Sequence, residues 1–280
     1  MNATSFVLNL LFALGTCVAW LLLAFGVSRI VHRHAVIDVF WGSGFLIVYL
    51  ESLGSSALLS RHASHPWFHD DAAMTARLLV LALVALWALR LSGYLALRQR
   101  GQGEDPRYTM ILRGAKGRNE NLYALKTIYG LQMALLFFVS LPLQWLAFAQ
   151  NSMLLVAALG GVLMAVGLGF EALGDAQLRA FLRNAANKGT TLRTGLWRYT
   201  RHPNYFGDAV VWWGIFVVAA STGWGLLTVL SPVAMTYLLT SVSGKPLLEG
   251  RLKRTRPDYE DYLASTSGFF PRRPKKPSNS

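Results

Sequence analysis

Long apolar runs recur along the whole chain, and they constrain its fold more than any other feature. A helix needs about 20 mostly apolar residues to cross a membrane. Runs of roughly this length occur about seven times, over residues 6–27, 35–53, 78–97, 127–148, 153–174, 209–221 and 226–242. Because 53% of the 280 residues are also hydrophobic, we predict an all-α, polytopic membrane protein rather than a soluble domain with a single anchor.

Basic residues give the chain a formal net charge of +13, and most of them lie between the apolar runs. They follow the first, third and fifth runs and fill the segment after the last one. By the positive-inside rule, this pattern predicts an outer N-terminus and a cytoplasmic C-terminus. It favours contact with anionic membrane lipid, and we do not expect nucleic acid as a partner. We expect one domain over residues 1–270 and a disordered, basic tail at residues 271–280.

Few residues offer redox or metal chemistry. Cys17 is the only cysteine, which excludes an intrachain disulfide and a cysteine metal cluster. His62, His65 and His69 have a spacing that could suit a metal, but no cysteine accompanies them and we expect them to be solvated. We therefore predict no metal site.

The densest polar motif stands directly before an apolar helix. From Arg201 to Asp208 the chain reads Arg-His-Pro-Asn-Tyr-Phe-Gly-Asp, and residues 209–220 are apolar or small. The proline restrains the backbone at the helix start, and the glycine permits close approach. We expect four polar side chains of this motif to be aimed at one anionic or amide-bearing ligand; they are Arg201, His202, Asn204 and Asp208. The alternative is a collar of charged side chains that reach toward the membrane surface.

Ionisable residues inside the apolar runs form a second group. Placing such a residue in a membrane costs a few kcal/mol, so each one is a functional-site hypothesis. Asp38, Arg90 and Tyr94 fall near the cytoplasmic ends of their predicted helices, where they could share a pocket. Alternatively, Asp38 and Arg90 only neutralise each other. Glu51 lies about 20 Å further along its helix than Asp38, so we expect it near the outer surface.

Clusters of arginine suggest a phosphorylated ligand, since guanidinium groups bind phosphate through paired hydrogen bonds. The clusters comprise Arg98, Arg100 and Arg107; Arg179 and Arg183; and the basic residues from 251 to 256. Asp175 precedes Arg179 by four residues, so both share one helix face. A solvated basic loop would look the same, and Gly101-x-Gly103 lacks the third glycine of a soluble dinucleotide-binding fold.

Taken together, these motifs resemble the membrane steroid 5-alpha-reductases and their bacterial relatives of the DUF1295 group. The similarity rests on Asp38-Val-Phe-Trp-Gly42, Arg90-Leu-Ser-Gly-Tyr94, Glu104-Asp-Pro-Arg-Tyr108, the stretch from Gly195 to Asp208, and the tail from Pro257 to Pro271. The 201–208 motif also resembles a segment of the sterol C14- and C7-reductases. A shorter version of the motif is found in membrane methyltransferases that use S-adenosylmethionine, and those enzymes lack the Glu-Asp-Pro-Arg-Tyr loop.

The resemblance implies a seven-helix oxidoreductase of the bacterial inner membrane. It implies NADPH at the cytoplasmic side, a lipophilic steroid or similar enone that enters from the bilayer, and no obligate protein partner. Hydride would reach the β-carbon of a 3-oxo-Δ4 steroid while an acid polarises the carbonyl oxygen. The residues that the resemblance assigns to the cofactor are Arg90, Arg98, Glu104, Asp105, Arg107, Tyr108, Asp175, Arg179, Arg183, Tyr199, Arg201, His202, Asn204, Tyr205, Asp208, Glu249 and Tyr259.

The catalytic acid differs from that of the animal enzymes. Those enzymes use a glutamate and a tyrosine as the donor pair, whereas this chain has Trp87 at the tyrosine position. We therefore take Asp38, Tyr94 and, in reserve, Glu51 as candidate catalytic acids. Two alternatives to the reductase remain, namely a membrane methyltransferase that uses S-adenosylmethionine and a non-catalytic membrane protein that binds lipid.

Overall fold

The computed structural model describes residues 3–59, 71–242 and 244–275, and within these ranges the regular structure is entirely helical. Six helices of the described part are long and apolar enough to cross a membrane, namely Thr4–Val31, His34–Leu59, Asp71–Gln99, Glu120–Val139, Leu154–Arg183 and Trp224–Thr255. The prediction of an all-α, polytopic membrane protein is thus confirmed, with six candidate spans where we expected about seven. The side of the membrane on which each terminus lies stays a prediction.

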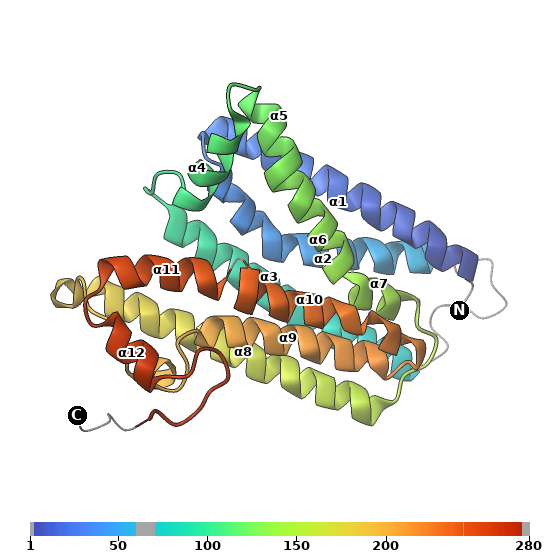
Figure 1. The fold of residues 1–280 in the computed structure, drawn as a ribbon. Coiled ribbons are helices and arrows are strands. Elements are labelled where there is room, and N and C mark those ends of the chain that lie inside the picture. Colours follow the sequence, from blue (N-terminus) through green and yellow to red (C-terminus); the bar gives the residue numbers. More distant parts are fainter. Residues whose placement is uncertain (1–2, 60–70, 243, 276–280) are drawn as a thin grey trace. The chain divides into compact units, whose positions relative to one another are not determined.

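The α-helices are shown in Figure 1 and have the following bounds: α1 (Ala3–Val31), α2 (Ile37–Leu59), α3 (Asp71–Gln99), α4 (Pro106–Leu112), α5 (Glu120–Ala124), α6 (Leu131–Val139), α7 (Leu141–Phe148), α8 (Leu154–Arg183), α9 (Pro203–Ala220), α10 (Leu230–Tyr237), α11 (Lys245–Thr255) and α12 (Tyr259–Ser265). Two π-helical segments, Leu125–Gly130 and Leu238–Val242, continue into or out of neighbouring helices. Short 3-10 turns fill several of the connections, among them His34–Val36 before α2 and Gly195–Arg198 before α9.

Two of the expected spans differ in the structure. The apolar run at 209–221 belongs to α9, whose first two turns carry Asn204 and Asp208, and this helix is not among the six apolar spans. The run at 127–148 is not one span, because α6 ends at Val139 and α7 begins at Leu141. Pro142 lies in the first turn of α7. Its ring lacks an amide hydrogen and cannot continue the preceding helix, which explains the break.

The chain forms two compact units, which we describe separately. Unit 1 comprises Met1–Ala158 and Val218–Ser231, and unit 2 comprises Leu159–Val217 and Pro232–Ser280. Our expectation of one domain over residues 1–270 stays a prediction. Of the expected disordered tail, residues 271–275 are described and have no regular structure, and residues 276–280 lie outside the described residues.

Helices α1, α2 and α3 form the centre of unit 1, with α6 and α7 packed against them. Gly44 allows α2 to approach two neighbours at once, since a Cβ atom there would lie 3.0 Å from Leu136 of α6 and 3.1 Å from Trp20 of α1. On the next face, the rings of Phe45 in α2 and Trp87 in α3 are buried with their centroids 6.0 Å apart. This packing fixes the start of α2, which carries Asp38, relative to the end of α3.

In unit 2, the antiparallel helices α8 and α9 approach so closely that both need glycine. A Cβ atom on Gly207 would lie 2.5 Å from the carbonyl oxygen of Gly167, and one on Gly214 would lie 2.7 Å from that of Gly160. These glycines are seven residues apart on each helix, so both contacts fall on one seam. The seam holds the polar start of α9 against the last turns of α8.

Candidate functional site

The loop between α3 and α4 is fastened to the connection between α1 and α2 in unit 1. The Glu104 carboxylate accepts hydrogen bonds from the backbone amides of His34, at 2.5 Å, and Ala35, at 2.9 Å. Arg33 donates in the opposite direction, to the carbonyl oxygens of Gln99 and Gln102. The segment from Gly101 to Asp105 is therefore held against the connection between α1 and α2, in part by the Glu104 carboxylate.

At the end of this loop, four side chains of unit 1 form what we call the loop cluster: Asp38, Asp105, Arg107 and Tyr108. Asp38 accepts a hydrogen bond at 2.6 Å from Arg107 Nη2 and one at 2.5 Å from the Tyr108 hydroxyl. Asp105 caps α4 by accepting from the Arg107 amide at 2.8 Å, and it also binds Arg107 Nε at 3.0 Å. One arginine is thus held between two carboxylates, and the Tyr108 ring lies beside its guanidinium.

The charges in the loop cluster reinforce one another. Burial alone would raise the pKa of Asp105, but the hydrogen bonds and the charge of Arg107 outweigh it, and the pKa lies below its ordinary value. Burial and the neighbouring Asp38 carboxylate hold the pKa of Tyr108 well above its ordinary value. Tyr108 therefore keeps its proton at neutral pH and acts as a hydrogen-bond donor to Asp38.

Asp105→Asn is expected to lower stability at neutral pH and to have no such effect in acid. Both side chains can cap α4, so the difference between them reports the charge interaction with Arg107. Because the folded-state pKa of Asp105 is lowered, its contribution is present above the unfolded pKa of about 4 and is lost as the pH falls further. The measurement is the difference in unfolding temperature between wild type and variant, from pH 7 to pH 3 in detergent.

Asp105→Ala serves as the second arm of that test. It removes the cap as well as the charge, and losing an N-cap costs about 1 kcal/mol at any pH. A difference between wild type and Asp105→Asn that does not shrink below about pH 4 would contradict the assigned role of Arg107.

Polar groups also meet where α8 and α9 cross in unit 2. We call Glu171, Asp175, Asn204 and Asp208 the helix-crossing cluster. Asn204 Nδ2 donates to Asp175 Oδ1 at 3.2 Å, and Asn204 Oδ1 accepts from the amide of Tyr205 at 3.1 Å. Glu171 and Asp175 are each only 3% exposed. Ionisable side chains inside a membrane helix are costly, so these two carboxylates make the helix crossing a candidate functional site.

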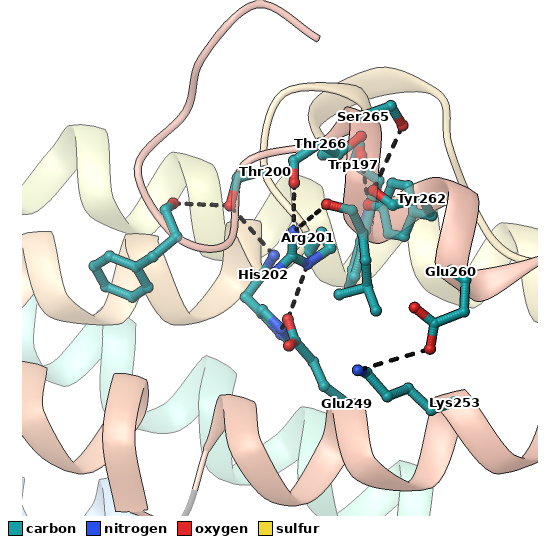
Figure 2. Close-up of polar contacts among 12 residues, drawn as sticks. Trp197, Thr200, Arg201, His202, Glu249, Lys253, Glu260, Tyr262, Ser265 and Thr266 are labelled. Atoms are coloured by element: carbon teal, nitrogen blue, oxygen red, sulfur yellow. Dashed lines mark hydrogen bonds and ion pairs between the residues drawn. The ribbon is translucent and has the colours of Figure 1, made fainter. Parts of the chain in front are cut away.

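The same motif fastens the C-terminal segment of unit 2 (Figure 2). Arg201 Nε donates to Glu249 Oε1 at 2.9 Å, and Arg201 Nη1 donates to the carbonyl oxygens of Leu263, at 3.3 Å, and Thr266. His202 Nε2 meets the same Glu249 oxygen at 2.9 Å. Arg201 and Glu249 are 9% and 12% exposed, so this ion pair is largely removed from water. We call Arg201, His202, Glu249 and the two tail carbonyls the tail clamp.

His202 is 1% exposed and lies parallel to the Tyr205 ring, with their centroids 5.3 Å apart. Burial lowers the pKa of His202 and outweighs the opposing effect of Glu249, so the ring is neutral at neutral pH. Since the Glu249 carboxylate can only accept, the proton lies on Nε2. Nδ1 is buried and has no hydrogen-bond partner among the described residues.

Further contacts of unit 2 hold the segment before α9 and the tail together. Trp197 Nε1 donates to the carbonyl oxygen of Gly174 at 3.0 Å, and the Tyr262 hydroxyl donates to that of Trp197 at 2.5 Å. Thr200 binds the carbonyl oxygen of Phe269 at 2.8 Å. Hydrogen bonds therefore join the C-terminal half of α8, the segment before α9, α12 and the tail.

The structure brings together many of the residues singled out in the sequence. Within unit 1, Asp38 joins Asp105, Arg107 and Tyr108, and Glu104 supports them from the same loop. Within unit 2, the residues that join are Asp175 with Asn204, and Arg201 with His202, Tyr205 and Glu249. Tyr259 is buried on α12.

The remaining singled-out residues lie on α2, α3 and α8 or in the segment before α9. Glu51 is on α2, thirteen residues beyond Asp38 and thus about 20 Å away, and it accepts a hydrogen bond from Ser52 at 3.4 Å. Tyr94 is buried on α3, one turn beyond Arg90, with the Arg98 guanidinium 6.0 Å from its ring centre. The exposed members are Arg98, Arg179, Arg183 and Tyr199. His62, His65 and His69 lie outside the described residues.

Two residues of unit 2 are absent from the set that the sequence predicts. Glu171 stands four residues before Asp175, and this helical spacing is the signal that could have found it. Lys245 looks like one of many basic residues in the sequence. Only the folded chain distinguishes it, because its Nζ lies 2.8 Å from a Cβ atom built on Gly268. Within the described residues, no group of His, Cys, Asp and Glu side chains is arranged to hold a metal ion.

A comparison with protein-family models identifies the relationship of the chain. The model named DUF1295, whose description is a protein of unknown function, matches residues 24–266. The chain belongs to the DUF1295 family. The matched region runs from α1 to the end of the tail clamp, so all three clusters lie inside it. No curated protein and no solved structure matched the chain.

Proposed function

We propose that this DUF1295 protein is an NADPH-dependent reductase of lipophilic enones, most concretely of the Δ4 double bond of 3-oxo-Δ4 steroids. The observation that carries the proposal is the helix-crossing cluster. It places one amide and three carboxylates where α8 and the start of α9 cross, in a protein with six candidate membrane spans among its described residues. Such polar groups can recognise a small, hydrogen-bonding ligand next to a lipophilic substrate.

The donors and acceptors of this cluster fit a nicotinamide cofactor chemically. Asn204 and Asp208 would hold a carboxamide, which both donates and accepts hydrogen bonds. Asp175 would accept from ribose hydroxyls, and the exposed Arg179 and Arg183, one and two turns further along α8, would hold phosphates. When bound, the cofactor supplies hydride to the β-carbon of the enone.

The chain must also polarise the substrate carbonyl, and its three candidate acids differ in what surrounds them. Both oxygens of Asp38 accept hydrogen bonds, from Arg107 and from Tyr108. Tyr94 is a buried residue one turn from Arg90. A phenol donates well to a developing oxyanion in a dry site, so we propose Tyr94 as the donor, with Asp38 and Glu51 as the remaining candidates.

We further propose that the protein lies in the bacterial inner membrane with its cofactor side facing the cytoplasm. The multi-pass fold is established by the six candidate spans. The distribution of Lys and Arg between the apolar runs supports the orientation. We propose that the substrate enters from the bilayer, where a lipophilic enone concentrates.

The test is steroid-dependent oxidation of NADPH, followed by absorbance with the full chain in detergent. Progesterone or testosterone is expected to stimulate oxidation by the wild type. Asp208→Ala is expected to weaken NADPH binding by at least about tenfold, because a hydrogen bond to a charged group contributes about 1.5–3 kcal/mol. Calorimetric titration of NADPH measures this loss directly.

Asp261→Ala is the matched control, since this carboxylate belongs to the same unit but is exposed on α12. It should leave both binding and turnover unchanged. Binding of S-adenosylmethionine in place of NADPH would overturn the reductase and favour the methyltransferase. If NADPH binds but no lipophilic enone is turned over, the proposed substrate class is refuted and the proposed cofactor site stands.

A further inference from the structure

A second place in unit 2 gathers positive charge around a glycine. A Cβ atom built on Gly268 would lie 2.8 Å from Lys245 Nζ and 3.0 Å from Arg201 Nη2. The two cationic nitrogens therefore flank one point beside the backbone of Gly268, where any other residue would carry a side chain. We call Lys245, Arg201 and Gly268 the cradle.

The two cations are held differently. Arg201 is fixed because its Nε binds Glu249 and its Nη1 binds the carbonyl oxygens of Leu263 and Thr266 (Figure 2), so its Nη2 is presented in one direction. Lys245 forms no ion pair in the part of the chain that the structure describes. The cradle thus combines a rigid donor with an ammonium group that can adjust to a ligand.

Within the ranges that the structure describes, the cradle carries more positive charge than its ion pairs neutralise. Arg201 and Lys245 carry two positive charges, and Glu249 supplies one negative charge to Arg201. Lys245 is also the first residue of α11, where the positive end of the helix dipole disfavours a cation. The positive charge of Lys245 also acts on a nearby group, since it contributes to lowering the pKa of His202. An anion bound here would relieve this repulsion.

We infer that the cradle binds a phosphate group. A phosphate has several oxygens in a tetrahedral arrangement, so it can accept from Lys245 Nζ and Arg201 Nη2 at once, and Gly268 places no side chain between these two nitrogens. The inference rests on the proposed function insofar as the phosphate belongs to the diphosphate of the cofactor. A phospholipid headgroup presents the same chemistry from the bilayer.

The experiment compares Lys245→Met and Gly268→Ala with Gly250→Ala in the full chain. Lys245→Met keeps most of the aliphatic stem, Gly268→Ala places a methyl group between the two cations, and a Cβ atom on Gly250 of α11 meets nothing within 4 Å. Inorganic pyrophosphate, NADPH and mixed micelles of phosphatidylglycerol are the probes, with binding measured by calorimetry. We expect both cradle variants to bind pyrophosphate about tenfold more weakly or worse, and Gly250→Ala to match the wild type.

The probes separate the two sources of phosphate. A parallel loss for NADPH supports the cofactor diphosphate, whereas a parallel loss for phosphatidylglycerol with unchanged NADPH supports a lipid headgroup. If the wild type binds pyrophosphate but not NADPH, the reductase fails and the cradle stands. Unchanged binding of all three probes in both cradle variants, at unchanged unfolding temperature, would overturn the inference.

Discussion

Gly207→Ala is expected to destabilise unit 2 and to abolish tight NADPH binding together. The new Cβ atom would lie 2.5 Å from the carbonyl oxygen of Gly167 and 2.6 Å from the amide nitrogen of Glu171. Both are backbone atoms, so no change of side-chain rotamer relieves the clash, and the two helices must separate. Overpacking of this kind costs about 1–3 kcal/mol, occasionally more.

The effect on binding follows from the same movement. Asn204 and Asp175 are joined at 3.2 Å across this crossing, and a shift of the helices by a few tenths of an ångström or more disrupts that contact. We expect NADPH affinity to fall by more than about tenfold, since a side chain that we propose to hold the cofactor is displaced. Thermal unfolding in detergent and calorimetric titration measure the two effects.

Gly169→Ala is the matched control on the facing helix. Gly169 lies two residues from Gly167 on α8, and a Cβ atom there meets nothing within 4 Å. Replacing an unconstrained helical glycine by alanine should stabilise the protein by roughly 0.5–1 kcal/mol and leave NADPH binding unchanged. Equal effects of the two substitutions would show that helix propensity, and not the seam, decides the outcome.

The sequence predicted the membrane helices well, because apolar length is a local property. Its errors lay where local signals compete. Pro142 interrupts an apolar run that is otherwise long enough to span the membrane. Because proline restricts the residues before it, the helix breaks between α6 and α7. Likewise, α9 is not among the candidate spans, because its polar first turns offset the apolar residues that follow them. Both signals are visible in the sequence.

The site residues could be chosen from the sequence, but their partners could not. Asp38 and Arg107 are 69 residues apart, and Arg201 and Thr266 are 65 apart, so only the folded chain joins them. A basic residue in a loop looks the same whether it binds a ligand, a lipid or its own tail. For Arg201 the structure shows hydrogen bonds to the carbonyl oxygens of Leu263 and Thr266, and its Nη2 lies beside Gly268.

These contacts change what the 201–208 motif is expected to do. The sequence predicts a set of side chains aimed at one ligand. In the structure, Asn204 lies in the helix-crossing cluster, whereas Arg201 and His202 fix the C-terminal segment. One short motif therefore supports two tasks, which are to present polar groups and to hold in place the segment that carries Gly268.

Arg201→Met is expected to release the C-terminal segment and to lower the free energy of unfolding by about 3–5 kcal/mol. The substitution leaves the largely buried Glu249 without its guanidinium partner and two tail carbonyls without a donor. Removing one member of a buried ion pair is costly because the other remains desolvated. Thermal unfolding measures the stability, and limited proteolysis between α12 and the C-terminus measures release of the segment.

The ion pair between Lys253 and Glu260 is the matched comparison, since it also joins α11 to α12 in unit 2 (Figure 2). Its side chains are 49% and 70% exposed and its atoms are 3.7 Å apart. Water screens such a pair, so Lys253→Met should change stability by no more than about 1 kcal/mol. The tail clamp would be refuted as the main fastening of the tail if Arg201→Met were equally mild and left proteolysis unchanged. Each substitution removes one cation from an ion pair within unit 2. A large loss of stability in Arg201→Met alone would therefore show that burial makes the Arg201–Glu249 pair essential.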